Sequence, residues 1–326
     1  MKLIVFSICK DEAKTIGQVL DDIPKSIPGI TSIDKLVISD GSTDRTAEIA
    51  KKHGADVIEG SQQKRLAHRF QQAIDVALNS GADIAVNIDG DMQFSPKDIP
   101  KLVDPIVNGD ADFVAADRFT DSNTGQRRRP KNMPSSKYWA NRLGAWTMGA
   151  LSDYKFNDVT CGFRAYNRSA MYALNLNSKY TYTQESFQIL AKKRMNIMSI
   201  PIEVKYFKGR KSRVVTNFGQ FLFGSALNIL RAFRDFAPLR FFTYMGFIPF
   251  ILGTLATGFV GLHWLDTGRT SPYQFIGLTG VYLLSLAIVI WIIGVVADML
   301  DRVLNNQEKM IELEKRALYE RAKDKK

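Results

Sequence analysis

The chain has 326 residues, of which 45% are hydrophobic and 24% are charged, and its formal net charge is +11. This length has room for one sizeable soluble domain and for further elements beside it. The two cysteines, Cys9 and Cys161, are too few for a framework of disulfides and suit a reducing compartment.

In chain order, the first part of the sequence alternates short apolar runs with amphipathic segments. The runs predict strands at residues 2–8, 34–39, 55–59, 82–88 and 112–116. The segments between them predict helices at residues 12–23, 43–52 and 64–78, and a further helix from Ser95-Pro96 onward. This alternation favours an α/β fold with a mostly parallel sheet and helices on both faces.

Two aspartates lie one residue apart directly after the expected strand 82–88. Asp89 and Asp91 therefore stand at the strand end where open α/β sheets bind their ligands. With the amide oxygen of Gln93 they make a hard oxygen site, which suits Mg²⁺ or Mn²⁺ carrying a diphosphate. An isolated Asp-x-Asp is often only a solvated turn, so the other motifs decide between these two interpretations.

Positive charge is concentrated in residues 118–142 and 205–240. The first segment includes residues 119–136, which lack periodicity and predict a loop over the ligand side. Anionic lipid head groups explain part of this charge, and a phosphate-bearing substrate explains the rest. Nucleic acid is the competing partner, but the sequence contains no recognition motif for it.

The end of the sequence contains two uncharged apolar stretches, at residues 241–264 and 275–297. Each is long enough to cross a bilayer core of roughly 30 Å, so they predict a transmembrane hairpin; two buried helices of a soluble core are the alternative. Lys and Arg flank the outer ends, whereas the link carries only Arg269, and the positive-inside rule places both termini in the cytoplasm. Residues 216–238 predict an interfacial helix lying on the membrane. The charged tail, residues 298–326, has a weak apolar pattern that suits either a solvated helix or pairing of subunits in a homo-oligomer.

Four ordered segments carry a resemblance to a known family. They are Val37–Asp44, Asn87–Gln93, Ala116–Phe119 and Asp158–Tyr166. With them the chain resembles inverting family 2 glycosyltransferases of the polyprenyl-phosphate branch, and is similar to dolichyl-phosphate mannose synthases and undecaprenyl-phosphate glucosyltransferases. The absence of a Gln-x-x-Arg-Trp segment argues against a processive polysaccharide synthase.

The resemblance implies a nucleotide-diphospho-sugar transferase (GT-A type) domain over residues 1–215. The juxtamembrane region 216–238, two membrane helices within 239–297 and a cytoplasmic tail, 298–326, would follow it. The implied reaction moves a hexose, glucose or mannose, from a UDP- or GDP-sugar to undecaprenyl or dolichyl phosphate, with inversion and with Mg²⁺ or Mn²⁺ as cofactor. The alternative functions are transfer to a hydroxyl group of a lipid or glycan, and a non-catalytic role beside another membrane transferase.

By the same resemblance, the nucleotide-sugar is bound by residues of three strand ends: Ile8, Glu12, Asp40, Asp89 and Gly90. Glu12 and Asp40 would contact the base and ribose, the metal would be held by Asp89, Asp91 and Gln93, and Glu185 matches a glutamate in the helix after the last motif. The chain departs from the family at Ile8-Cys9-Lys10-Asp11-Glu12, where only the glutamate of Pro-x-Tyr-Asn-Glu is retained. Ser39 replaces the first of two adjacent aspartates.

A lipid monophosphate acceptor is already an anion, so it needs positioning rather than a general base. Arginine side chains supply this positioning because they bind phosphate bidentately. The residues expected to hold the acceptor phosphate are Arg118, Arg127, Arg128, Arg129, Arg164, Arg210 and Arg213. Asp158 is expected to orient the acceptor or to act as a base. The expected catalytic set is Asp89, Asp91, Asp158 and Arg118.

Overall fold

The computed structural model describes residues 1–64, 66–152, 154–176, 182–206, 230–231 and 233–323. The chain divides into two compact units. The first unit comprises Met1–Thr216 together with Lys309–Lys326, and the second comprises Asn217–Glu308. The first contains the expected α/β domain, and the second contains the two expected apolar segments.

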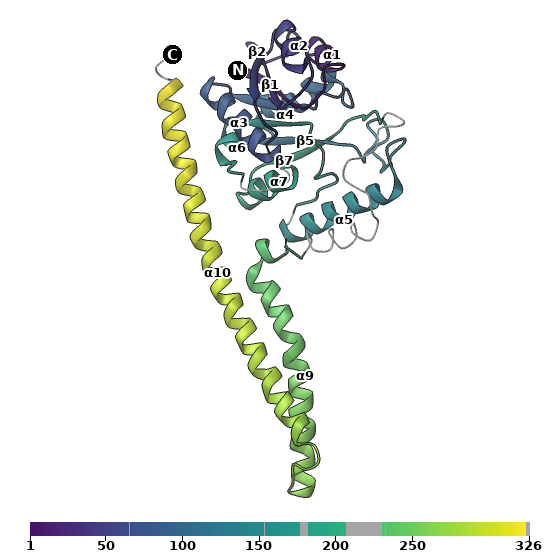
Figure 1. Ribbon diagram of the computed structural model, residues 1–326, viewed down its shortest axis with the longest axis vertical. Coiled ribbons are helices and arrows are strands. Elements are labelled where there is room, and N and C mark those ends of the chain that lie inside the picture. The colour runs from purple at the N-terminus through teal and green to yellow at the C-terminus, as the bar shows by residue number, and fades with distance from the viewer. Residues whose placement is uncertain (65, 153, 177–181, 207–229, 232, 324–326) are drawn as a thin grey trace. The chain divides into compact units, whose positions relative to one another are not determined.

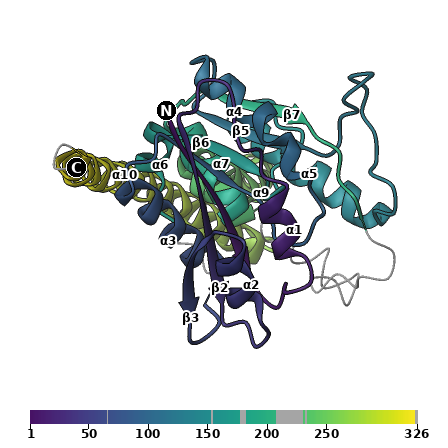
Figure 2. The same cartoon turned by 90° about the horizontal axis from the view of Figure 1, so that it is seen from above.

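Within the described residues, the first unit is built on one seven-stranded sheet in the order β3-β2-β1-β4-β6-β5-β7 (Figure 2). The strands are β1 (Lys2–Cys9), β2 (Ser32–Asp40), β3 (Asp56–Gly60), β4 (Ile84–Asn87), β5 (Phe113–Asp117), β6 (Arg164–Asn167) and β7 (Ile197–Pro201). Strand β6 runs antiparallel to β4 and β5, and the other neighbouring pairs are parallel. Strands β1, β2, β4 and β5 therefore end at the same edge of the sheet.

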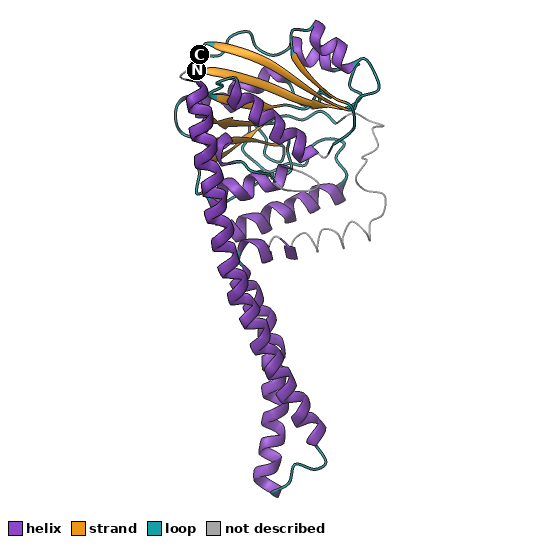
Figure 3. Ribbon diagram, turned by 60° about the vertical axis from the view of Figure 1, so that its left-hand side comes forward, coloured by secondary structure: helices purple, strands orange, loops and turns teal. Residues whose placement is uncertain are grey.

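Helices cover both faces of this sheet (Figure 3). They are α1 (Ile16–Asp21), α2 (Thr46–Lys52), α3 (Leu66–Asn79), α4 (Ile99–Val107), α5 (Ser135–Ser152), α6 (Arg168–Ala173) and α7 (Tyr182–Lys192), with a 3₁₀ turn η1 (Pro96–Asp98) before α4. In β1, Leu3 and Val5 belong to the core cluster that contains Ile16 of α1. Phe6 points to the opposite face, where its ring lies 5.6 Å from that of Phe70 of α3. A strand that is buried on both faces has to be apolar throughout, which explains the continuous run in β1.

The expected α/β fold with a mostly parallel sheet is confirmed: among the described strands, β6 alone runs against the others. Strands β1 to β5 occur where strands were expected, whereas β6, β7, α5 and α6 were not predicted. Strand β6 begins with Arg164 and ends with Asn167, so it lacks the apolar run that marks β4, and β7 is interrupted by Ser199 and ends in a proline. The expected helix 12–23 begins only at Ile16, because Asp11 has a φ of 55° and the chain turns at Glu12.

The second unit contains α9 (Pro238–Thr267) and most of α10 (Gln274–Lys323), at the two expected apolar stretches (Figure 1). By length and composition both helices are able to cross a membrane. Glycines bring their backbones together: a Cβ on Gly253 would lie 2.8 Å from the carbonyl oxygen of Gly280. Such contacts between small residues are typical of helices packed in membranes. The expected interfacial helix, 216–238, lies largely outside the described residues.

Candidate active site

Charged side chains gather at the edge of the sheet where its parallel strands end. Asp40 is the last residue of β2, Asp89 lies two residues after β4, and Arg118 directly follows β5. This edge is where open α/β sheets bind their ligands. The fold thus places along one edge of the sheet residues that are up to 78 positions apart in the sequence.

The carboxyl group of Asp89 has a strongly perturbed pKa. Burial, followed by the negative charge of Asp91, raises this pKa to about 6, while Arg118 and Arg164 counteract the rise. No other described residue forms a hydrogen bond or ion pair with this carboxylate. Two carboxylates that repel each other, one of them without a donor, fit a divalent cation.

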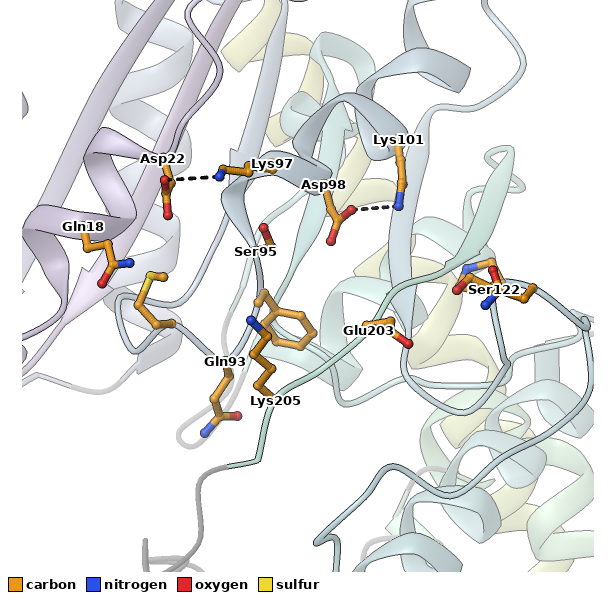
Figure 4. A pocket seen from close by; sticks show the side chains of 14 residues that line it. Gln18, Asp22, Gln93, Ser95, Lys97, Asp98, Lys101, Ser122, Glu203 and Lys205 are labelled. Carbon is orange, nitrogen blue, oxygen red and sulfur yellow. Dashed lines mark ion pairs between the residues drawn. The ribbon is translucent and has the colours of Figure 1, made fainter.

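The number of acidic ligands limits what kind of cation site this edge can form. The described residues contain no group of three or more His, Cys, Asp or Glu side chains that could hold a metal ion. A Mg²⁺ or Mn²⁺ ion would therefore be bound by Asp89 and Asp91 together with the phosphates of a substrate, a ligand set that Mg²⁺ commonly uses. The side chain of Gln93, the expected third ligand, lines a cleft of about 650 Å³ whose lining includes neither aspartate (Figure 4).

Local packing fixes the turn that carries the two aspartates. Position 90 leaves no room for a side chain, because a Cβ on Gly90 would lie 2.6 Å from the Sγ atom of Cys9. The hydroxyl group of Thr15 donates a hydrogen bond to the carbonyl oxygen of Gly90 at 2.7 Å. Cys9 and Thr15 thereby hold the segment that contains Ile8 and Glu12 against this turn. Consistent with this proximity, the charge of Glu12 contributes to the raised pKa of Asp89.

Asp40, which was expected at the ribose, forms a buried ion pair with Arg69. The Nε atom of Arg69 lies 2.7 Å from Oδ1 of Asp40, and the two side chains are 4% and 8% exposed. The backbone amide of Lys64 donates to the same oxygen at 2.8 Å. Asp40 thus holds the segment after β3 in place, and its contact with a ribose stays a prediction. Sequence reasoning missed Arg69 because no local pattern links it to Asp40.

Asp158 is enclosed by the guanidinium group of Arg118. Nε and Nη2 of Arg118 donate to its two oxygens at 2.6 and 2.8 Å, and Thr160 donates through its backbone amide at 3.0 Å. Burial raises the pKa of Asp158, but the charge and hydrogen bonds of Arg118 and the hydrogen bonds of Thr160 together lower it, and the pKa lies below its usual value. A weakly basic carboxylate that is already bound on both oxygens suits an orienting role rather than that of a general base.

Arg164 does not lie where an acceptor phosphate could reach it. Its side chain is 0% exposed, and it donates to the carbonyl oxygens of Cys161 and Val159 and to the hydroxyl group of Ser186, at 2.6, 3.1 and 2.6 Å. The expectation that Arg164 binds the acceptor is therefore corrected: its guanidinium group supports the chain just before β6.

The loop arginines differ in how far they are engaged. Arg128 pairs with Asp121 at 2.9 Å and with Glu203 at 3.2 Å, so it closes the base of the loop. Arg127 and Arg129 are exposed. These two side chains are accessible to an anionic group from solvent. The remaining expected residues, Arg210 and Arg213, lie outside the described residues.

Tyr182 is a site residue that the sequence did not indicate. It is the first residue of α7, the helix that also carries Glu185, and its hydroxyl oxygen accepts a hydrogen bond from Nδ2 of Asn87. The two residues are 95 positions apart, so no local pattern connects them. Only the resemblance, through Glu185, pointed to this helix.

Comparison with known proteins identifies relatives of the chain. The model of the family "Glycosyl transferase family 2" matches residues 4–174. Glycosyltransferase AglJ of Haloferax volcanii is 25% identical over 93% of this chain and 94% of its own length. A dolichyl-phosphate hexose transferase of the same organism is 31% identical over 59% of this chain and 78% of its own length.

A solved structure shares the fold of the first unit. Glucosyl-3-phosphoglycerate synthase from Mycobacterium tuberculosis, in complex with Mn²⁺, UDP and glucosyl-3-phosphoglycerate, matches with a TM-score of 0.53 and 18% identity. The match covers 71% of this chain and 78% of that chain. At this level of identity the likeness concerns the fold alone, and it agrees with the expected nucleotide-diphospho-sugar transferase architecture.

Proposed function

The chain belongs to glycosyl transferase family 2, and we propose that it moves a hexose from a nucleotide-diphospho-sugar to polyprenyl phosphate with inversion. The name of the 31% identical relative, dolichyl-phosphate hexose transferase, supports this choice of acceptor. The donor is a UDP- or GDP-hexose.

One observation carries the proposal: the Asp89 carboxylate lies beside Asp91 at the strand edge and has no partner among the described residues. A Mg²⁺ or Mn²⁺ ion bound there would neutralise the charge that develops on the departing diphosphate. The chain's own residues keep the carboxylates in place for this task. Thr15 and Gly90 fix the turn, and the positive charge of Arg118 favours the ionised form of Asp89.

The state of Asp158 favours a phosphate acceptor over a hydroxyl acceptor. A hydroxyl group needs a base to remove its proton, whereas a lipid monophosphate is an anion at neutral pH and only needs positioning. Both oxygens of Asp158 are bound by Arg118, so this carboxylate is not free to act as that base. The exposed guanidinium groups of Arg127 and Arg129 would hold the acceptor phosphate.

The proposal is tested with the purified full chain in detergent, a panel of radiolabelled UDP- and GDP-hexoses, and two acceptors. We expect transfer to a short polyprenyl phosphate with Mg²⁺ or Mn²⁺ and no transfer to the matching polyprenol. Asp91→Asn replaces a carboxylate that would bind the cation, and we expect it to reduce the rate of transfer by at least about 100-fold. This is the usual loss of rate when one group that stabilises the charge of the transition state is removed. Transfer to polyprenol, or a fully active Asp91→Asn variant, would contradict the proposal.

The two long apolar helices of the second unit favour a place for this reaction at a membrane surface. We propose that α9 and α10 span the bilayer and that both chain termini lie in the cytoplasm. Arg231, Arg234 and Arg240 before or at the start of α9, and Arg302 after the apolar part of α10, support this orientation under the positive-inside rule.

A further inference from the structure

The side chain of Asn87 connects three segments beside the two aspartates. Asn87 is the last residue of β4, two positions before Asp89, and it is 2% exposed. Its Nδ2 atom donates to the carbonyl oxygen of Gly162 at 2.8 Å and to the hydroxyl oxygen of Tyr182. One amide thus joins strand β4, the chain before β6, and the first turn of α7.

The directions of these two hydrogen bonds follow from their chemistry. A carbonyl oxygen can only accept, so the amide of Asn87 has to turn its NH₂ group toward Gly162. The second N–H of this group then donates to Tyr182, whose oxygen is the acceptor. The hydroxyl hydrogen of Tyr182 is left to donate to another group.

Gly162 leaves a space open between the Tyr182 hydroxyl group and the Asp89 carboxylate. A Cβ on Gly162 would lie 3.1 Å from both carboxylate oxygens of Asp89 and 3.1 Å from the hydroxyl oxygen of Tyr182. All three oxygens therefore line the same small space. One water molecule in this space can accept a hydrogen bond from the hydroxyl group of Tyr182 and donate one to the carboxylate of Asp89.

Packing holds the Tyr182 ring in the position that this geometry requires. The ring is stacked on that of Phe70, with centroids 4.1 Å apart and planes 10° apart, and Tyr182 is 2% exposed. A buried and stacked ring cannot rotate its hydroxyl group toward solvent. The hydroxyl group therefore stays directed at the space beside Asp89.

Resting on the proposed function, we propose that Tyr182 is a positioning residue that orients the Asp89 carboxylate for a divalent cation. Its hydroxyl group donates a hydrogen bond to one water molecule, which in turn donates to this carboxylate. Gly162 is required because a side chain there would occupy the space in which this hydrogen bond forms. Tyr182 acts through Asp89 and does not itself contact the sugar.

Binding of Mn²⁺ to the purified full chain tests this proposal independently of activity. The concentration of free Mn²⁺ is followed by electron paramagnetic resonance, with UDP or GDP present. Tyr182→Phe removes the hydroxyl group and keeps the ring on Phe70, so the chain should fold. Loss of a hydrogen bond to a charged group should weaken Mn²⁺ binding by on the order of tenfold.

Tyr166→Phe is the matched control. Tyr166 is 0% exposed, its ring also packs against Phe70, and among the described residues its hydroxyl group has no hydrogen-bond partner. We expect this variant to bind Mn²⁺ with the affinity of the parent chain. A loss equal to that of Tyr182→Phe would overturn the proposal, because it would indicate a general effect of the aromatic cluster.

Gly162→Ala provides a second variant that removes no hydrogen-bonding group. The added methyl group enters the space between Tyr182 and Asp89, and we expect it to weaken Mn²⁺ binding by at least as much as Tyr182→Phe. Unchanged Mn²⁺ affinity in Tyr182→Phe and in Gly162→Ala would overturn the positioning role of Tyr182 but not the proposed function. A parent chain that binds no Mn²⁺ with either nucleotide would instead contradict the cation of the proposed function.

Discussion

The ion pair between Asp158 and Arg118 is buried, and removal of one charge should be costly. The two side chains are 0% and 9% exposed. Asp158→Asn leaves the Arg118 charge buried without its partner, which should lower the free energy of unfolding by about 3–5 kcal/mol. Denaturant unfolding of the detergent-solubilised chain measures this loss. Asp121→Asn is the control: its pair with Arg128 is partly exposed, so the loss should stay below about 1 kcal/mol.

The same pair predicts how stability depends on pH. Burial raises the pKa of Asp158, but the charge of Arg118 and the hydrogen bonds from Arg118 and Thr160 together hold this pKa below its usual value, which is near 3.9 in an unfolded chain. The pair therefore stabilises the folded state fully above about pH 4, and this contribution is lost as the pH falls through the lower, folded-state pKa. Melting temperatures recorded from pH 7 to pH 3 should fall more steeply below pH 4 in the parent chain than in Asp158→Asn. Parallel curves would contradict this prediction.

Arg164 and Arg127 should respond to substitution in opposite ways. Arg164 donates to three groups from a fully buried position, and a lysine cannot replace this planar set of donors. We expect Arg164→Lys to lower the melting temperature by several degrees, since a loss of about 1 kcal/mol corresponds to roughly 2–4 °C in a domain of this size.

Arg127 is exposed, so Arg127→Ala should leave the melting temperature unchanged and raise the KM for polyprenyl phosphate. An unchanged KM in Arg127→Ala would remove this residue from the acceptor site.

At the scale of elements, the last turns of α10 pack on α6 and on the chain directly after it, within the first unit. Tyr319 is 8% exposed and its ring is stacked on that of Tyr172 at 6.4 Å. The ammonium group of Lys315 donates to the carbonyl oxygen of Leu174 at 2.8 Å. Tyr319→Ala should therefore destabilise the first unit by about 3 kcal/mol, the usual loss for a buried aromatic side chain. Leu318→Ala is the control, since Leu318 is 58% exposed and should change stability little; equal losses would contradict the packing.

These elements also show what sequence reasoning can reach. Strands β1 and β4 were predictable because a strand buried on both faces is apolar throughout, and Asp89 and Asp91 were predictable because they directly follow such a strand. Strand β6 was not predictable, because Arg164 and Asn167 at its ends leave no apolar run in its four residues. The partners of the site residues were missed for a different reason: Arg69 and Tyr182 reach Asp40 and Asn87 through the fold.

At the scale of the whole molecule, the distribution of positive charge agrees with a reaction on lipid-linked phosphate. The segment 118–142 is rich in Lys and Arg, but its arginine side chains have different environments. Arg118 and Arg128 bind acidic side chains and so shape the site, whereas Arg127 and Arg129 remain exposed. The number of Lys and Arg residues in this segment therefore overstates the positive charge that is available to an anionic ligand.

The orientation of the chain in a membrane is testable because its own thiols are unreactive. Cys9 and Cys161 are each 1% exposed, and burial raises the pKa of Cys161 to about 12, so few thiolates are available for labelling. A single cysteine introduced as Thr270→Cys, in the exposed link between α9 and α10, should react with a membrane-impermeant maleimide on intact cells. One introduced as Glu320→Cys, on the exposed side of the last turns of α10, should react only after the membrane is opened, because the proposed orientation keeps the Lys- and Arg-rich ends in the cytoplasm. Labelling in the reverse pattern would invert the proposed orientation, and labelling of both positions on intact cells would contradict a membrane-spanning hairpin.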